Sequence, residues 1–234
     1  MPDALVPDAW VTVTVRTDAP GRSDRIAALR RALGVALARL SGNPALDGDP
    51  RLEREDVAPL VLDLSYEDVM IDKPLNDEQG TRDRPFLLTV RFEAGALIRL
   101  LNSLGEKPWL GPRPRVAPML TLRFRDGAER PLTADDPLLD RPRAALTAAA
   151  TRYAVPVALP GAGAGAGTGV GAGVGAGEVP RRAIRLDARL EWVDAEFGWR
   201  GSFALRGDVW GVSGVSLDEA FRVLVGGAAL RLRQ

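Results

Sequence analysis

The sequence predicts an α+β fold built as two small lobes, each with a mixed or antiparallel sheet packed against one or two helices. Segments in which apolar and polar residues alternate, typical of half-buried strands, occur in both halves of the chain. Segments with apolar residues three and four apart, typical of amphipathic helices, accompany them. A proline-rich connector over residues 107–114 separates the halves. We therefore expect an N-terminal lobe over residues 1–107 and a C-terminal lobe over residues 108–234.

The N-terminal lobe is expected to follow the order β-α-β-β-α. Valines alternate with threonines over residues 11–15, which predicts its first strand. Apolar residues then recur at helical spacing from Ile26 to Leu40. This helix is predicted to end at Gly42, because glycine readily takes the left-handed conformation and the following proline prevents continuation. The remaining predicted elements are strands over residues 59–64 and 86–92, an exposed loop over residues 72–84 and a helix over residues 97–104.

The C-terminal lobe also mixes strands and helices. Its clearest strand covers residues 184–192, where apolar and polar or charged residues alternate, and residues 198–207 are the predicted hairpin partner. Asp135 or Asp136 is predicted to cap a helix, and Pro142 predicts that this helix starts late. The remaining predicted elements are strands over residues 116–125 and 155–159 and a terminal helix opened by the capping box of Ser216 and Glu219.

A glycine-rich tract interrupts the C-terminal lobe. Glycine occupies every odd position over residues 161–177, with alanine, threonine or valine between. A phosphate-binding GxGxxG loop needs an odd spacing between two of its glycines, which strict alternation does not supply. The tract has few side chains to bury, so we expect a flexible linker. A silk-like stacking strand is the alternative.

The composition excludes several kinds of chemistry. The chain has no histidine and no cysteine, which rules out Ser-His-Asp and Cys-His nucleophilic sites and zinc held by these residues. Lys+Arg and Asp+Glu both number 31, and a zero net charge does not favour nucleic-acid binding. No cofactor-binding motif occurs, so we expect no cofactor.

Membrane and export signals are also missing from the sequence. No uncharged apolar run approaches the ~20 residues needed to cross a bilayer. The first residues have neither the basic n-region nor the apolar h-region of a signal peptide. We therefore expect a soluble chain without a signal peptide.

Carboxylates suggest one candidate site in the N-terminal lobe. Glu67 and Asp68 are adjacent, lie outside any predicted helix start, and have Asp63 and Asp72 nearby. Paired acids can serve glycoside hydrolysis or bind a divalent cation. A solvated loop without function is the alternative interpretation, and it is the one we favour.

Tryptophans suggest a second candidate site. Trp109 and Trp210 lie in segments flanked by proline or glycine, where neither helical nor strand periodicity explains them. Aromatic side chains of this kind often anchor a partner. We therefore expect these two residues to be the best candidates for an exposed contact surface.

Several short motifs, taken in order, resemble an uncharacterised bacterial family, the domain of unknown function 2066. The resemblance covers most of the chain except residues 161–177. It implies an exported envelope protein without established activity or known catalytic residues, and hence a periplasmic location. The missing signal peptide departs from the family and leaves a cytoplasmic location as the alternative, and the glycine-rich tract replaces a structured segment. The resembling motifs are Leu40-Ser41-Gly42-Asn43-Pro44, Val90-Arg91-Phe92, Leu100-Leu101, Gly105, Trp109, Arg113-Pro114, Val155-Pro156-Val157 and Gly214-Val215-Ser216-Leu217-Asp218-Glu219.

These observations favour a non-catalytic binding or assembly module of the bacterial cell envelope. Its expected partner is a protein or another envelope component. A carboxylate-dependent hydrolase, built around the acidic candidates, is one alternative. Binding of a small molecule between the lobes is the other. The sequence does not indicate an oligomeric state.

Overall fold

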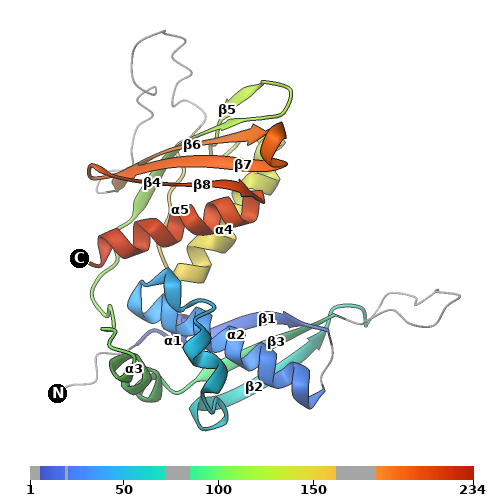
Figure 1. Cartoon of the computed structure of the whole chain (residues 1–234), viewed down its shortest axis with the longest axis vertical. Coiled ribbons are helices and arrows are strands. Elements are labelled where there is room, and N and C mark those ends of the chain that lie inside the picture. The colour runs from blue at the N-terminus through green and yellow to red at the C-terminus, as the bar shows by residue number, and fades with distance from the viewer. Residues whose placement is uncertain (1–5, 19–20, 72–84, 162–182) are drawn as a thin grey trace, which may run out of the picture. The chain divides into compact units, whose positions relative to one another are not determined.

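The computed structural model describes residues 6–18, 21–71, 85–161 and 183–234 (Figure 1). The chain divides into two compact units, Met1–Leu110 and Gly111–Gln234. Each unit has its own sheet packed with helices, so the predicted α+β class is confirmed. Among the described residues, no helix is both long and apolar enough to span a bilayer.

The N-terminal unit contains a three-stranded antiparallel sheet. Its strands are β1 (Thr12–Thr17), β2 (Val61–Asp68) and β3 (Phe86–Phe92), arranged in the order β1-β3-β2. The predicted β-α-β-β-α order is present, preceded by one short helix. The helices are α1 (Asp8–Val11), α2 (Arg22–Ser41) and α3 (Ala94–Ser103), and three 3-10 helices follow α2: η1 (Pro44–Leu46), η2 (Pro50–Arg54) and η3 (Ala58–Leu60).

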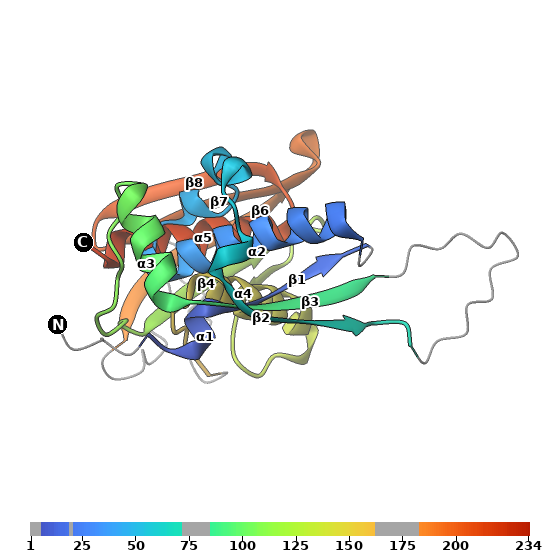
Figure 2. The same ribbon diagram turned by 90° about the horizontal axis from the view of Figure 1, so that it is seen from below.

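One face of this sheet packs against α2, as Figure 2 shows. Val13, Leu88 and Val90 alternate toward the core and are buried. The opposite face is polar, and there the hydroxyls of Thr14 and Thr89 form a cross-strand hydrogen bond of 2.9 Å. The sheet therefore has one covered face and one polar face.

The C-terminal end of α2 fits the local sequence. Gly42 takes the left-handed conformation with φ +73°, and its N–H bonds the carbonyl of Ala38, as predicted. Arg39 is only 6% exposed because its guanidinium donates to the carbonyls of Ala9 and Thr12. This buried arginine ties α2 to the first strand.

One prediction for the N-terminal unit needs correction, and another falls outside the described residues. The strand predicted to end at Leu64 continues to Asp68, so Glu67 and Asp68 belong to β2 and not to a loop. Pairing with β3 supplies the backbone hydrogen bonds that local propensity did not indicate. The loop predicted over residues 72–84 lies outside the described residues.

The C-terminal unit contains a five-stranded mixed sheet in the order β5-β4-β6-β7-β8. Strands β4 and β6 are parallel, and the other neighbours are antiparallel. The elements are β4 (Val116–Arg123), β5 (Glu129–Pro131), η4 (Pro137–Leu139), α4 (Asp140–Tyr153), β6 (Ile184–Val193), η5 (Asp194–Glu196), β7 (Gly198–Leu205), β8 (Asp208–Val215) and α5 (Leu217–Leu232).

The predicted caps of this unit are present at η4 and α5, whereas α4 starts after Leu139 without a side-chain cap. Asp136 accepts a hydrogen bond from the N–H of Leu138, which caps η4, and α4 begins late with Pro142 in its first turn. The hydroxyl of Ser216 accepts from the N–H of Glu219 and caps α5. The residue pattern near these starts was sufficient to find them.

Two strand predictions in the C-terminal unit differ from the structure. Residues 155–159 form only a single bridge, between Val157 and Val116. Strands β5 and β8 were not predicted at all. The glycine-rich tract lies outside the described residues except for Gly161.

Candidate functional site

An open groove runs beside α2 in the N-terminal unit. It lies between the N-terminal half of this helix and the chain over residues 48–58, and we call it the α2 groove. Two adjoining hollows of about 370 and 440 Å³ make up the groove, and Arg30 lines both. The first hollow is lined by Ala27, Arg30, Arg31, Gly48, Asp49, Leu52 and Glu53, and the second by Arg25, Ile26, Leu29, Arg30, Arg54, Glu55, Asp56, Val57 and Ala58.

Apolar residues form the base of the groove. Leu29, Leu52 and Val57 line it and are 7%, 3% and 4% exposed. Ile26 lies one helical turn before Arg30 and remains 40% exposed. Because these residues belong to the core of the unit, the groove has a firm base that does not need a ligand to form.

Charged residues of both signs border the groove. Arginines predominate on the α2 side and carboxylates on the opposite side, so two walls of different sign face one space. Among the described residues, the Nε atom of Arg30 is buried without a hydrogen-bond partner. The charged lining residues are Arg25, Arg30 and Arg31 from α2, and Asp49, Glu53, Arg54, Glu55 and Asp56 from the opposite wall.

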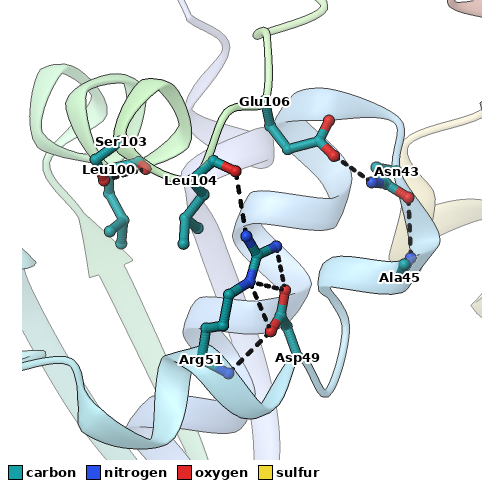
Figure 3. A network of polar contacts seen from close by, with 8 residues as sticks. All are labelled: Asn43, Ala45, Asp49, Arg51, Leu100, Ser103, Leu104 and Glu106. Carbon is teal, nitrogen blue, oxygen red and sulfur yellow. Dashed lines mark hydrogen bonds and ion pairs between the residues drawn. The ribbon is translucent and has the colours of Figure 1, made fainter.

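A polar network holds the opposite wall in place (Figure 3). Asp49 caps η2 by accepting from the N–H of Arg51 at 2.9 Å, and its carboxylate also lies 2.6 Å from Nη2 of Arg51. The other arm of the guanidinium donates to the carbonyl of Leu104, just after α3, at 3.2 Å. Asn43 donates to Glu106 at 2.7 Å, so a second bond connects the same two segments. The wall is therefore anchored to the chain that follows α3.

The ion pair on this wall shifts both ionisation equilibria. The hydrogen bond from Arg51 lowers the pKa of Asp49, although partial burial of the carboxylate opposes the shift. The same hydrogen bond raises the pKa of Arg51. Both residues therefore stay charged across the physiological pH range. Asp49 is already paired with Arg51, which leaves Glu53, Glu55 and Asp56 as the acidic groups of the wall for a ligand.

Gly34 explains how closely α2 approaches the chain that leads into this wall. A Cβ atom on Gly34 would lie 2.9 Å from the carbonyl oxygen of Leu46 and 3.2 Å from the amide nitrogen of Gly48. Such distances are too short for ordinary packing, so only glycine fits here. The spacing between the helix and the 3-10 segment is fixed by this contact.

The acidic residues predicted as a site do not line the α2 groove. Asp63 and Glu67 share one face of β2 and are exposed, about 13 Å apart along the strand, whereas Asp68 lies on the other face. The carboxylates of Asp63 and Asp68 accept backbone hydrogen bonds from Leu64 and Met70. Asp72 lies outside the described residues. In the described part of the chain, no three acidic residues converge as a metal site would require.

The two predicted tryptophans lie in different units. The backbone N–H of Trp109 donates to the carbonyl of Leu40 at 2.8 Å, near the end of α2, and its side chain is half-buried. Trp210 lies on β8, where its indole N–H donates to the carbonyl of Val223 in α5 at 3.1 Å. Its ring also packs against Phe203 and lies 4.1 Å below the guanidinium of Arg231. The ring of Trp210 is thus packed within the C-terminal unit, and a partner contact at either tryptophan stays a prediction.

Sequence reasoning missed the α2 groove, although two signals were present. Asn43-Pro44 and Asp49-Pro50 each place a capping side chain before a proline, which is typical of a short helix start. Arg30 and Arg31 lie at the edge of the apolar face of the predicted helix. Together they indicate a helix flanked by a structured segment, but not the space between them.

No protein-family model matches this chain, and neither a curated protein nor a solved structure matches it. The resemblance to the domain of unknown function 2066 stays a prediction.

Proposed function

We propose that the chain is a partner-recognition module whose α2 groove binds an extended segment of another protein. The observation that carries the proposal is the combination of a buried apolar base with charged walls of both signs. Protein interfaces share this anatomy, with an apolar centre, a polar rim and an enrichment in arginine. The proposal assigns the chain no catalytic step.

Arg30 is the proposed centre of recognition. It lines both hollows, and its Nε–H has no acceptor among the described residues. A carboxylate on the partner would pair with the positive guanidinium group of Arg30 in a charge-assisted contact, which is stronger than a bond between neutral groups. An acidic side chain opposite Arg30 is therefore the first feature we expect in the bound segment.

The acidic wall supplies the second feature. Glu53 borders one hollow and Glu55 the other, so basic side chains on both sides of the central acid would find a counter-charge. Like charges at these places would be repelled, which gives the groove a means of rejecting wrong partners. The predicted ligand is thus a segment of mixed charge with apolar residues between the charges.

An envelope location, and specifically a periplasmic one, belongs to the proposal through the family resemblance alone. Fractionation of the organism's own cells tests it, with the chain expected in the periplasmic or membrane-associated fraction. Recovery in the cytoplasm alone would contradict the envelope location and would leave the proposal for the α2 groove unchanged.

Selection from a displayed library of random peptides tests the groove. Enriched peptides are synthesised with a fluorescent label, and their affinity is measured by anisotropy for the whole chain and for Arg30→Ala. We expect an affinity loss of about tenfold or more, because the acid on the peptide would lose its charged partner. The matched control is Arg141→Ala, which removes an exposed helical arginine in the other unit and is expected to leave the affinity unchanged. Failure to enrich any peptide, or equal affinity for Arg30→Ala and the unmodified chain, would overturn the proposal.

A further inference from the structure

An exposed aromatic residue stands at the turn between β6 and β7. Phe197 follows η5 directly and is 87% exposed. Its backbone is in the left-handed region, with φ +48°. A bulky side chain rarely adopts this conformation, which glycine and asparagine tolerate far better. Phe197 is therefore unfavourable for the fold in two ways, through its exposure and through its backbone.

Other exposed apolar residues in the described chain lack this combination. Leu138 and Val209 are each 69% exposed, but neither has a positive φ. Isolated apolar residues on a surface are common and need no explanation. Phe197 is different because folding alone would favour a smaller residue at the same place.

Several interactions hold the turn rigid beneath Phe197. The carboxylate of Asp194 accepts from the indole N–H of Trp192 at 2.8 Å and lies 2.7 Å from the guanidinium of Arg125. The N–H of Phe197 donates to the carbonyl of Asp194 at 3.2 Å, and Arg200 pairs with Glu196. The aromatic ring is thus presented from a fixed base, which lowers the entropy lost on binding.

The residue after Phe197 adds to this rigidity. A Cβ on Gly198 would lie 2.7 Å from the carbonyl carbon of Gly214 and 2.8 Å from the amide nitrogen of Val215. The backbone of β8 therefore passes directly beside the turn.

We infer that Phe197 is an anchor that inserts into an apolar pocket of a partner protein. Large, rigid aromatic side chains dominate the affinity of many interfaces. The charges around the ring favour a protein over a membrane. Asp194 and Glu196 balance Arg125 and Arg200, so the turn lacks the positive charge that draws a surface to anionic lipid. The inference shares with the proposed function only the assignment of a protein partner, since Phe197 is not part of the α2 groove.

Photocrosslinking from the position itself is the first test. A benzophenone analogue of phenylalanine replaces Phe197 in the whole chain, in the organism's own cells, and in a second strain it replaces Leu138 as the control. We expect a discrete protein adduct from position 197 that is absent from position 138. Absence of a protein adduct at 197, or adducts with lipid only, would overturn the inference.

The decisive step is to purify the partner protein that the crosslink identifies and to measure its affinity for the chain. Phe197→Asn is expected to weaken its affinity for the chain by about tenfold or more, the size typical of a central aromatic anchor. The melting temperature of Phe197→Asn should equal or exceed that of the unmodified chain, since asparagine tolerates the left-handed conformation. Leu138→Asn should leave the affinity unchanged. Equal binding by Phe197→Asn and the unmodified chain would refute the anchor.

The two sites can fail separately. Loss of peptide binding in Arg30→Ala, together with unchanged partner binding in Phe197→Asn, would remove only the anchor. The reverse result would remove only the groove.

Discussion

The guanidinium of Arg51 lies 2.6 Å from the carboxylate of Asp49, the residue that caps η2 on the wall of the α2 groove. Arg51 also donates to the carbonyl of Leu104, so one side chain joins the cap to the chain after α3. The side chain of Asp49 is 10% exposed, whereas that of Arg51 is 55% exposed. A local ion pair therefore sets the position of one wall of the α2 groove.

The Asp49–Arg51 pair predicts a pH-dependent stability. Because Arg51 lowers the pKa of Asp49 below its ordinary value of 3.8, the ionised carboxylate stabilises the fold above that value. This contribution is lost as the pH falls through the lower folded pKa. The free energy of unfolding, measured with urea at about pH 6 and about pH 3, should fall on acidification. The fall should be smaller for Asp49→Asn than for the unmodified chain.

The control for this measurement is Glu53→Gln, which removes an exposed carboxylate from the same wall. From about pH 6 to about pH 3, the free energy of unfolding of Glu53→Gln should fall nearly as much as that of the unmodified chain, and more than that of Asp49→Asn. An identical pH dependence for Asp49→Asn and the unmodified chain would show that the pair does not stabilise the wall.

Gly34→Ala is expected to destabilise the N-terminal unit by about 1–3 kcal/mol, because the new methyl group would press on the backbone at Leu46 and Gly48. An alanine in a helix normally stabilises, so the sign of the effect is diagnostic. Thermal and urea unfolding measure it. Gly111→Ala is the matched control, since nothing lies within 4 Å of its Cβ position, and a comparable loss there would contradict the close approach.

Gly227→Ala should destabilise the C-terminal unit by a similar amount, about 1–3 kcal/mol, because a Cβ at 227 would lie 2.3 Å from Nε1 of Trp210. Trp210→Leu also costs stability, but it removes the ring that the methyl group would strike. The double variant should therefore be more stable than the sum of the two single changes predicts. Simple additivity in this double-mutant cycle would mean that the indole does not lie against Gly227.

Strong local patterns made much of the fold predictable. Alternation of apolar and polar or charged residues over residues 184–192 corresponds to β6, because one face of that strand packs on the core and the other does not. The end of α2 was predictable since Gly42 and Pro44 act through the backbone and need no tertiary partner. Elements whose cause lies within a few residues can be found from sequence.

Elements that depend on distant segments could not be found in this way. Gly211 and Gly214 interrupt the pattern of β8, yet a Cβ on Gly211 would lie 2.6 Å from the carbonyl oxygen of Gly201. Glycine there permits close strand approach and does not break the strand. Without β8, Trp210 had no visible packing partner, which is why the sequence suggested an exposed surface.

The candidate site escaped prediction for the same reason. The sequence suggests that Leu29, Leu52 and Val57 are each buried, but not that they line one groove. The space between α2 and the 3-10 segment depends on the spacing that Gly34 and the Asp49–Arg51 pair set. Phe197 likewise has no local signal, since its left-handed backbone follows from the geometry of the β6–β7 turn. The acidic alternative rested on the adjacency of Glu67 and Asp68 along the chain, and strand alternation puts them on opposite faces of β2.

A single measurement locates the ligand most directly: amide chemical shifts of the isotope-labelled whole chain, followed by NMR as an enriched peptide is added. The proposal predicts that the largest changes fall on Ala27, Arg30 and Arg31 of α2 and on the opposite wall from Gly48 to Ala58. Changes centred on the strand that carries Asp63 and Glu67, or anywhere else in the described chain, would contradict the α2 groove as the binding site.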